Sequence, residues 1–243
     1  MLGGKKVLGV IGGMGPGATA YFMDLVVQMT EADVDQEHLD MIVYNFPSIP
    51  DRTGYIKDSS KPSPLEPMVR IANLLAQQGA DFLAIPCITA HYFYDELQKQ
   101  VPIPIIHCID ETVRYLKDAG MERVGVMGTD GTISSGLFHR SLEAYGMTVL
   151  TPSAPRQADV MHIIYSNIKA TKPIDMDRFR GASGELFDNG AQAIILGCTE
   201  LPLVKREHEI GAGFISVLEV LAYASIKRSG LKLKPEYRNL ISK

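Results

Sequence analysis

The sequence predicts an α/β protein with two pseudo-symmetric three-layer α/β/α domains, mainly parallel sheets and a functional site in the cleft between the domains. Two observations predict this fold. Short apolar segments rich in β-branched residues alternate with longer amphipathic segments, and Gly or Pro marks most of the junctions. Such alternation is typical of parallel sheets that are covered by helices on both faces. The second observation is an internal repeat with a spacing of 111 to 116 residues.

In the first half we predict strands over residues 5–11, 41–46, 81–86 and 103–106, and helices over residues 18–31, 67–78 and 89–100. A Gly-rich turn at residues 12–17 separates the first strand from the first helix. Pro67 suits the first turn of the second helix, and Gly79 can end it. The polar, Pro-rich segment 47–64 is longer than an ordinary connection, so we expect it to act as a lid over the site.

In the second half we predict strands near residues 123–127, 148–150 and 191–196, with helices between them and a last helix over residues 216–228. We expect residues 1–108 and 210–243 to form one domain and residues 109–209 to form the other. The basic tail over residues 227–243 is expected to be a solvated surface.

Composition excludes several classes of protein. The 24 Lys and Arg residues against 28 Asp and Glu residues give a net charge of −4, which argues against a nucleic-acid partner. With 46% hydrophobic and 21% charged residues, the chain is typical of a globular protein. No apolar run reaches the roughly 18–20 residues that cross a bilayer, and we expect no signal peptide and no membrane partner. Three cysteines cannot all pair, so we expect free thiols and a cytoplasmic protein.

Two pairs of segments carry the internal repeat. Residues 79–87 (GADFLAIPC) align with residues 190–198 (GAQAIILGC), and residues 9–12 (GVIG) align with residues 125–128 (GVMG). Buried strands share a composition, so similarity between them can arise by chance. The Gly-Ala start and the cysteine end at the same separation favour duplication instead.

Cys87 and Cys198 each lie just past the carboxyl end of an expected strand, where ligands bind in open α/β sheets. The positive potential at the start of the following helix favours a reactive thiolate. If the halves face each other, one sulfur can remove a proton from a carbon while the other supplies a proton to the opposite face, which is racemisation or epimerisation. The alternative is that both cysteines are merely small, buried apolar residues, which is the commoner role of a lone free cysteine. Because Cys87 and Cys198 lie at matching positions of the two halves, we favour a functional role for both.

Four segments carry a family resemblance: residues 12–16 (GGMGP), 50–53 (PDRT), 86–91 (PCITAH) and 197–201 (GCTEL). Together they resemble the aspartate/glutamate racemase family, most closely its aspartate racemase branch. The resemblance implies a cofactor-independent amino-acid racemase with two pseudo-symmetric α/β domains, usually a dimer, whose two catalytic cysteines fall on Cys87 and Cys198. The family usually has Asn directly after the first cysteine. Ile88 stands there in this chain and offers no hydrogen bond, so a less polar amino acid is an open alternative substrate.

Two cations are candidates for holding the substrate. Arg52 lies in the long polar segment, and its guanidinium can grip a carboxylate in a bidentate fork, as the resemblance also implies. A solvated loop arginine is the alternative. Lys169 ends the stretch 160–168, which has helical apolar spacing, and it resembles a substrate-binding lysine of the family. A lysine at a helix end that extends to solvent fits the same pattern equally well.

Further candidates are turn residues with backbone N–H groups or hydroxyls. Met14 lies on the Gly-rich turn, whose backbone N–H groups can receive a carboxylate. Hydroxyls at equivalent turns or after the cysteines can bond a substrate or cap a helix: Thr89, Thr129, Thr132 and Thr199. His91 and Glu200 are expected to tune or orient the thiols, with a purely structural role as the alternative. Cys87 and His91 have a spacing that suits a metal, but no further ligand pair completes a site, so we expect no metal.

Three other functions stay open. Residues 13–18 match the G-x-G-x-x-A pattern of a nucleotide-dependent oxidoreductase, but no acidic residue ends the second strand to bind a ribose. A non-catalytic amino-acid-binding protein and a related two-cysteine enzyme, such as a hydantoin racemase or maleate isomerase, are the others. The partners we expect are an amino acid as a small-molecule substrate and a second copy of the chain in a homodimer. We expect no cofactor.

Overall fold

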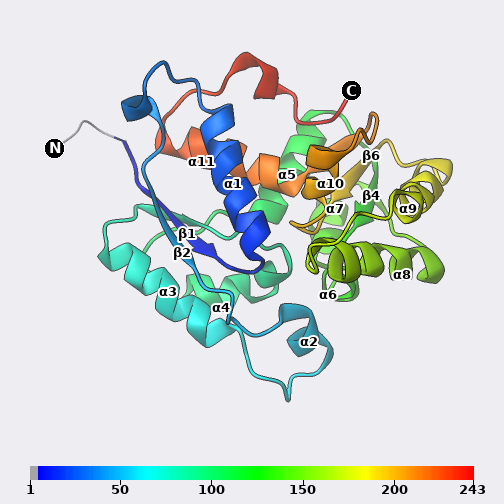
Figure 1. The fold of residues 1–243 in the computed structure, drawn as a ribbon, viewed down its shortest axis with the longest axis horizontal. Helices are drawn as coiled ribbons and strands as arrows, with labels where there is room; N and C mark the ends of the chain where they lie inside the picture. The colour runs from blue at the N-terminus through cyan, green and yellow to red at the C-terminus, as the bar shows by residue number, and fades with distance from the viewer. Residues whose placement is uncertain (1–4) are drawn as a thin grey trace.

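The computed structural model describes residues 5–243, and the predicted lack of a signal peptide concerns residues that partly lie outside this range. The chain forms two parallel sheets (Figure 1). The first has the order β2-β1-β3, with β1 at Leu8–Gly12, β2 at Met41–Asn45 and β3 at Phe82–Ala84. The second has the order β5-β4-β6-β7, with β4 at Arg123–Met127, β5 at Thr148–Leu150, β6 at Ala193–Leu196 and β7 at Phe214–Ser216. The predicted fold class is confirmed.

Helices cover both sheets, as Figure 1 shows for the first, which has α1 and α11 on one side and α3 and α4 on the other. The helices of the first half are α1 (Pro16–Met29), α2 (Arg52–Lys57), α3 (Leu65–Gln77), α4 (Tyr94–Gln98) and α5 (Cys108–Asp118). Those of the second half are α6 (Asp130–Ser134), α7 (Leu137–Ala144), α8 (Ala154–His162), α9 (Met176–Asp188), α10 (Pro202–Glu207) and α11 (Val217–Ser229). A π-helical segment over Ile163–Ile168 extends α8, and short 3-10 helices cover Asp35–Glu37, Thr89–Phe93 and Pro235–Arg238.

The two sheets have the same topology, as the internal repeat predicts. β1 and β4 lie at equivalent central positions, and β3 and β6, which end just before the cysteines, are their equivalent neighbours. Leu83 of β3 also forms a parallel bridge with Ile105, just as Ile194 of β6 pairs with Phe214 of β7. The chain therefore places Cys87 and Cys198 at matching ends of matching strands.

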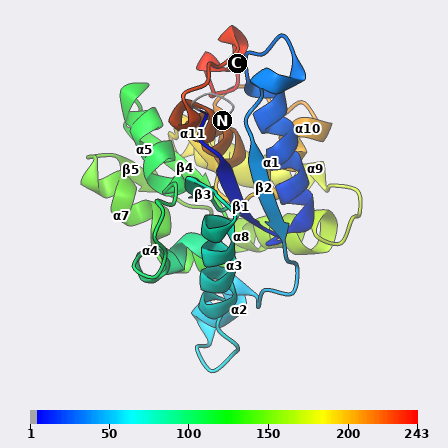
Figure 2. The same ribbon diagram turned by 90° about the vertical axis from the view of Figure 1, so that its left-hand side faces the viewer.

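The last helix of each half packs on the other half. α5 follows Ile105 but contacts α7, and α11 follows β7 but contacts α1 (Figure 2). α5 and α11 also contact each other. Each half thus contributes a helix to the other, whereas β7, which comes just before α11, lies in the second sheet. The domain boundaries at 108 and 209 stay a prediction.

The sequence predictions differ from the structure in four places. Residues 103–106 form a single bridge at Ile105 rather than a strand, because Pro102 and Pro104 have no N–H to donate to a ladder. The helix expected over residues 89–100 is split into a 3-10 helix and α4. The short strand β7 was not predicted, because three residues carry little periodicity. The basic tail is partly packed, since Leu240 is buried.

The Gly-rich turn after β1 depends on Gly13. This residue has φ +98°, and a Cβ there would lie 2.4 Å from the backbone carbon of Phe46. Glycine therefore lets the turn pass directly over the end of β2. The turn brings Met14 to the carboxyl edge of the first sheet, where Cys87 also lies.

Candidate active site

Both cysteines line one small pocket between the two halves of the chain. The pocket has a volume of about 10 Å³, so it has room for about one water molecule. Its lining from the first half is Met14, Asp51, Arg52, Thr53, Cys87, Ile88 and Thr89, and from the second half Thr129, Tyr165, Lys169, Cys198, Thr199 and Glu200. The structure thus brings together all the predicted site residues except Thr132 and His91, which lie behind this lining.

The lining also contains three residues that sequence reasoning missed. Asp51 and Thr53 flank Arg52 in segment 50–53, which carries the family resemblance. That segment could therefore have identified both as lining residues. Tyr165 lies four residues before Lys169, one helical turn away, and no sequence pattern marked it. Its hydroxyl lies 3.5 Å from Asp51 Oδ1 across the two halves.

Cys198 is a protonated thiol held by Glu200. Its Sγ donates to Glu200 Oε2 at 2.8 Å, and the Thr199 hydroxyl also donates to that oxygen. Burial and the Glu200 carboxylate raise the pKa of Cys198 well above its ordinary value, against a lowering by Lys169. The expectation that a helix start favours the thiolate is therefore wrong for Cys198, because desolvation and a neighbouring anion outweigh the helix potential.

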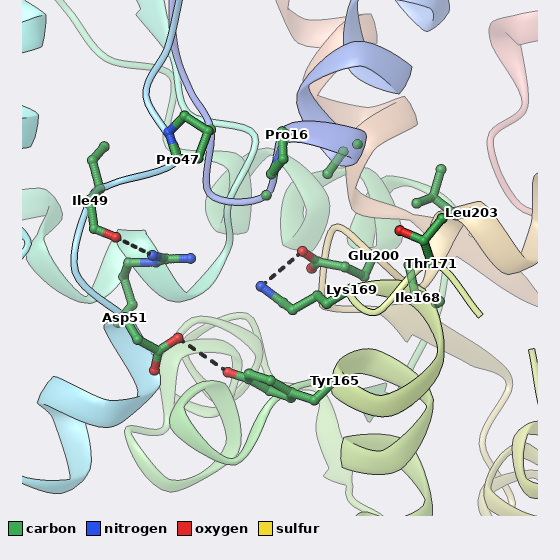
Figure 3. Close-up of a pocket in the computed structure, with 15 residues that line it drawn as sticks. Pro16, Pro47, Ile49, Asp51, Tyr165, Ile168, Lys169, Thr171, Glu200 and Leu203 are labelled. Atoms are coloured by element: carbon green, nitrogen blue, oxygen red, sulfur yellow. Dashed lines mark hydrogen bonds and ion pairs between the residues drawn. The ribbon is translucent and has the colours of Figure 1, made fainter.

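Lys169 joins Glu200 to the rest of the site. Its Nζ lies 3.2 Å from Glu200 Oε1 and 5.3 Å from the centre of the Tyr165 ring (Figure 3). Burial lowers the pKa of Lys169, but Glu200 and the two thiols raise it by more, so the net shift is upward. Lys169 is a cation that faces the pocket, and the alternative of a lysine extended to solvent does not describe its position.

Arg52 is buried and held by backbone carbonyls. Its Nη1 donates to Ile49 at 3.2 Å and Pro50 at 3.0 Å, and its Nη2 donates to Met14 at 3.2 Å. The Nε–H is buried and has no partner among the described residues. Burial lowers the pKa of Arg52, but Cys87, Asp51 and Glu200 together raise it by more, so the net shift is upward. The solvated-loop alternative is therefore wrong, because Arg52 is buried and lines the pocket.

Four threonine hydroxyls form a buried cluster that crosses the two halves. Thr89, Thr129 and Thr132 lie 3.1–3.2 Å from one another, and Thr53 lies 3.4 Å from Thr129. Thr129 also caps α6, because its hydroxyl accepts from the backbone N–H of Thr132. The cluster provides hydroxyl donors and acceptors beside Cys87, with Thr89 on the same loop as Cys87 and Thr129 and Thr132 at the start of α6.

His91 holds the backbone of Cys87 rather than its sulfur. Its Nδ1 lies 3.0 Å from the Cys87 carbonyl oxygen, and its Nε2 lies 3.2 Å from the backbone nitrogen of Cys108. A carbonyl only accepts and an N–H only donates, so the ring is neutral with its proton on Nδ1. Burial lowers the pKa of His91 to about 4. Cys108 is buried, and its thiol contacts the Val217 carbonyl outside the pocket.

The low pKa of His91 predicts acid destabilisation. The unfolded chain binds a proton at this position below about pH 6.5, whereas the folded chain does so only near pH 4. The free energy of unfolding should therefore fall by about 3 kcal/mol as the pH drops through this window. Urea titrations at several pH values measure it, with His91→Asn as the comparison because it lacks this titration. Equal pH dependence in both proteins would contradict the assignment.

A larger cavity of about 400 Å³ adjoins the pocket between the cysteines (Figure 3). The two share the residues Asp51, Arg52, Tyr165, Lys169 and Glu200. The rest of its lining comes from the Gly-rich turn, the start of α1, the end of the π-helical segment and the start of α10, and it includes Pro16, Gly17, Pro47, Ile49, Ile168, Thr171 and Leu203. We call this the outer cavity.

Between residues 5 and 243, no group of three or more His, Cys, Asp or Glu side chains has an arrangement that could hold a metal ion. Within the same range, none of the helices has the length and apolar character needed to cross a membrane.

Several known proteins are similar to this chain in fold and in sequence. The structure of Picrophilus torridus aspartate racemase has a TM-score of 0.80 and 32% identity, covering 96% of this chain and 98% of that one. The broad specificity amino-acid racemase RacX of Bacillus subtilis is 29% identical over 209 residues, which are 82% of this chain and 87% of the relative. A putative Asp/Glu racemase from Yersinia pestis shares the fold, with a TM-score of 0.77 and 23% identity over 92% of this chain and 99% of that one. Fold and site thus define an amino-acid racemase, which is an isomerase.

The family follows from the sequence as a whole. Residues 11–224 match the model of the Asp/Glu/Hydantoin racemase family. The chain belongs to this family, as its four motif segments suggest.

Proposed function

We propose that the protein interconverts the enantiomers of an amino acid, with aspartate and glutamate as the first candidates, by proton transfers at two opposed sulfurs. The observation that supports this most is that Cys87 and Cys198, from matching strand ends, line one pocket. The thiolate of Cys87 takes the α-proton, and the thiol of Cys198 gives its proton to the opposite face of the carbon. The mirror-image amino acid leaves a thiol at Cys87 and a thiolate at Cys198, and the other enantiomer reverses the steps.

Glu200 serves the Cys198 side of this reaction. Its Oε2 already accepts the S–H of Cys198 at 2.8 Å. Before Cys198 acts as the base, its proton moves to the Glu200 carboxylate and on to solvent, while the thiolate of Cys87 takes a proton from solvent, so that the two sulfurs exchange their protonation states. Lys169, 3.2 Å from the other carboxylate oxygen, keeps Glu200 in place.

Arg52 and Lys169 hold the substrate's carboxylate and stabilise the charge that develops on the carbanion. Arg52 can donate its unpaired Nε–H, and both cations line the pocket. Such preformed cationic donors act most strongly in a site from which water is excluded. Thr89, Thr129 and Thr199 and the backbone of Met14 supply further hydrogen bonds to the bound amino acid, and Thr132 holds Thr89 and Thr129 from behind. This chemistry needs no metal or other cofactor.

The pocket must open to admit an amino acid, because about 10 Å³ holds only one water. The segment over residues 47–64, which contains α2, is our candidate for the moving part. It contacts α6 of the other half closely, since a Cβ on Gly131 would lie 2.9 Å from Thr53 Oγ1. An ion pair of 2.5 Å between Lys57 at the end of α2 and Asp130 at the start of α6 stabilises this contact.

Replacing Lys57 with methionine should weaken closure. The ion pair is partly exposed, so its loss should lower kcat/KM by up to about five-fold, and salt should remove the difference. Steady-state kinetics at low and high salt measure this. Lys61→Met is the matched control, because Lys61 lies in the same segment and makes no ion pair among the described residues. Equal effects of the two substitutions would contradict the proposed closure.

We also infer that the protein works as a homodimer in the cytoplasm. The family resemblance supports the dimer, and α1 exposes two apolar side chains one turn apart, Met23 and Val27. Cys87, Cys108 and Cys198 are all free thiols, which suits a reducing compartment. Analytical ultracentrifugation tests the dimer directly.

The alternatives differ in substrate or in chemistry. Ile88 is buried and lines the pocket without a polar group, which favours a less polar amino acid. The alternatives on the same scaffold are a related two-cysteine isomerase and a non-catalytic binding protein, whereas family membership argues against the oxidoreductase. Chiral chromatography after incubation with aspartate, glutamate and neutral amino acids tests the proposal. Appearance of the opposite enantiomer supports a racemase, and binding without it supports the binding protein.

A further inference from the structure

The two sulfurs of the proposed reaction lie away from solvent. Cys87 and Cys198 are each 5% exposed, and the pocket that they line has room for about one water molecule. Neither cysteine lines the outer cavity. That cavity is the mouth of the cleft, because Pro16, Pro47 and Thr171 in its lining are exposed. A proton that travels between a sulfur and solvent must therefore cross the boundary between the two spaces.

One residue on this boundary is a base in contact with a sulfur. Glu200 lines both spaces, and its Oε2 accepts the S–H of Cys198 at 2.8 Å. Burial lowers the pKa values of Arg52 and Lys169, which also line both spaces, but neighbouring anions raise them by more, so both cations keep their protons. Asp51 is the other carboxylate on the boundary, and its oxygens face a backbone N–H and a tyrosine hydroxyl instead of a sulfur.

The second oxygen of Glu200 lies on the side of the outer cavity. Oε1 is paired with Lys169 at 3.2 Å and has no hydrogen-bond partner among the described residues (Figure 3). Gly15 lines the outer cavity beside this oxygen, and a Cβ on Gly15 would lie 3.1 Å from Oε1. Glycine therefore leaves this side of the oxygen without a covering side chain. The carboxylate of Glu200 thus reaches from Cys198 to the boundary of the outer cavity, where a proton can pass to water.

The surroundings of Cys87 differ from those of Cys198. Among the described residues, no carboxylate is hydrogen-bonded to the Cys87 sulfur. The charge of Arg52 acts on Cys87, and His91 holds the Cys87 backbone with a neutral ring. The water molecule for which the pocket has room is the carrier that can bring a proton to Cys87 or remove one. A bound amino acid takes the place of this water, so exchange with solvent belongs to the ligand-free enzyme.

We propose that Glu200 is the proton relay through which the ligand-free enzyme resets its two sulfurs between turnovers, and that this reset is a step separate from racemisation. The inference rests on the proposed two-thiol function. After a turnover that starts at the Cys87 thiolate, Cys87 carries a proton and Cys198 is a thiolate. Water in the outer cavity then protonates Glu200, Glu200 passes that proton to the Cys198 sulfur, and the water beside Cys87 takes the Cys87 proton. One proton enters and one leaves, so the charge of the site is unchanged.

A slow reset has a kinetic consequence of its own. The opposite enantiomer can also return the enzyme to its starting form, because it gives its α-proton to the Cys198 thiolate and takes the proton of Cys87. When the reset limits the rate, adding the unlabelled opposite enantiomer should therefore speed the conversion of a 13C-labelled enantiomer. When the reset is fast, the added enantiomer only competes for the enzyme and slows that conversion.

The experiment measures the one-way conversion of a 13C-labelled L-amino acid by chiral chromatography and mass spectrometry, with and without the unlabelled D-enantiomer. The amino acid is one that the unsubstituted protein racemises, chosen from aspartate, glutamate and the neutral amino acids. The D-enantiomer should slow conversion by the unsubstituted protein. It should speed conversion by Glu200→Gln at least about ten-fold, because loss of a positioned acid or base slows proton transfer by roughly 100- to 10,000-fold.

Two further variants separate a relay from a structural role. Glu200→Asp keeps a carboxylate but is shorter, whereas Glu200→Gln keeps the size and loses the carboxylate. A relay predicts that the D-enantiomer slows conversion by Glu200→Asp, as in the unsubstituted protein. Glu219→Gln is the matched control, because Glu219 is a buried carboxylate paired with Lys205 and lines neither space. It too should show slowing.

Other outcomes overturn the inference in distinguishable ways. Slowing by the D-enantiomer in Glu200→Gln, or speeding in Glu200→Asp, would show that the sulfurs reset without Glu200 and would leave the racemase function standing. A folded Glu200→Gln protein that converts nothing even with the D-enantiomer present would also overturn the relay. No racemisation of any amino acid by the unsubstituted protein would overturn the proposed function and this inference together.

Discussion

Replacing either Cys87 or Cys198 with alanine is expected to abolish racemisation, with a loss of kcat of at least about 1,000-fold. One positioned acid or base contributes roughly 100- to 10,000-fold, and the proposed reaction needs both sulfurs in every turnover. The loss of a single small side chain should leave the fold intact, which near-ultraviolet circular dichroism can check.

Cys108→Ala is the matched control for these variants. Cys108 is buried like the other two, and burial raises its pKa to about 12, but its thiol donates to the Val217 carbonyl and lies outside the pocket. The control should racemise at the parent rate. A Cys87→Ala or Cys198→Ala protein that keeps the parent rate would contradict the mechanism.

Glu200→Gln is expected to lower kcat by about 100-fold, because the amide cannot take the proton of Cys198. The equilibrium constant between two enantiomers is one, so kcat/KM must fall by the same factor in both directions. Removing the charge also removes one of the causes that raise the pKa of Cys198. The alkaline limit of the pH–rate profile, where Cys198 loses its proton, should therefore shift to lower pH.

A second buried carboxylate gives the control. Glu219 pairs with Lys205 at 2.8 Å, as Glu200 pairs with Lys169, but it lies outside the pocket. Glu219→Gln should change stability and leave kcat of the folded protein unchanged. An upward or absent shift of the alkaline limit in Glu200→Gln would show that the carboxylate does not act on Cys198.

Much of the fold follows from local patterns in the sequence. The strands β4 and β5 have the predicted bounds, and the repeat predicts the shared sheet topology. The chain around Ile105 was misjudged because apolar content predicts a strand, whereas Pro102 and Pro104 remove the donors that a strand requires. Strand β7 is too short to show a period.

Most residues that line the pocket between the cysteines were predictable from the sequence, but the electrostatics of the pocket were not. The repeat and the motif segments mark Cys87, Cys198 and Arg52. The state of Cys198 depends on burial and on the direction of the Glu200 side chain, which only the packing of the two halves determines. The same packing turns Lys169 into the pocket and leaves His91 on the Cys87 backbone. The proximity of Tyr165 to Asp51 is likewise a contact between halves, which no local pattern encodes.

The most direct measurement of the central claim is the early isotope content of both enantiomers during racemisation in D2O. Two sulfurs on opposite faces take protium from one side and deliver solvent deuterium from the other. We therefore predict deuterium at the α-carbon of the newly formed enantiomer while the remaining starting enantiomer still carries protium. Equal early deuterium in both enantiomers, or protium retained in the product, would indicate a single base and contradict the two-thiol mechanism.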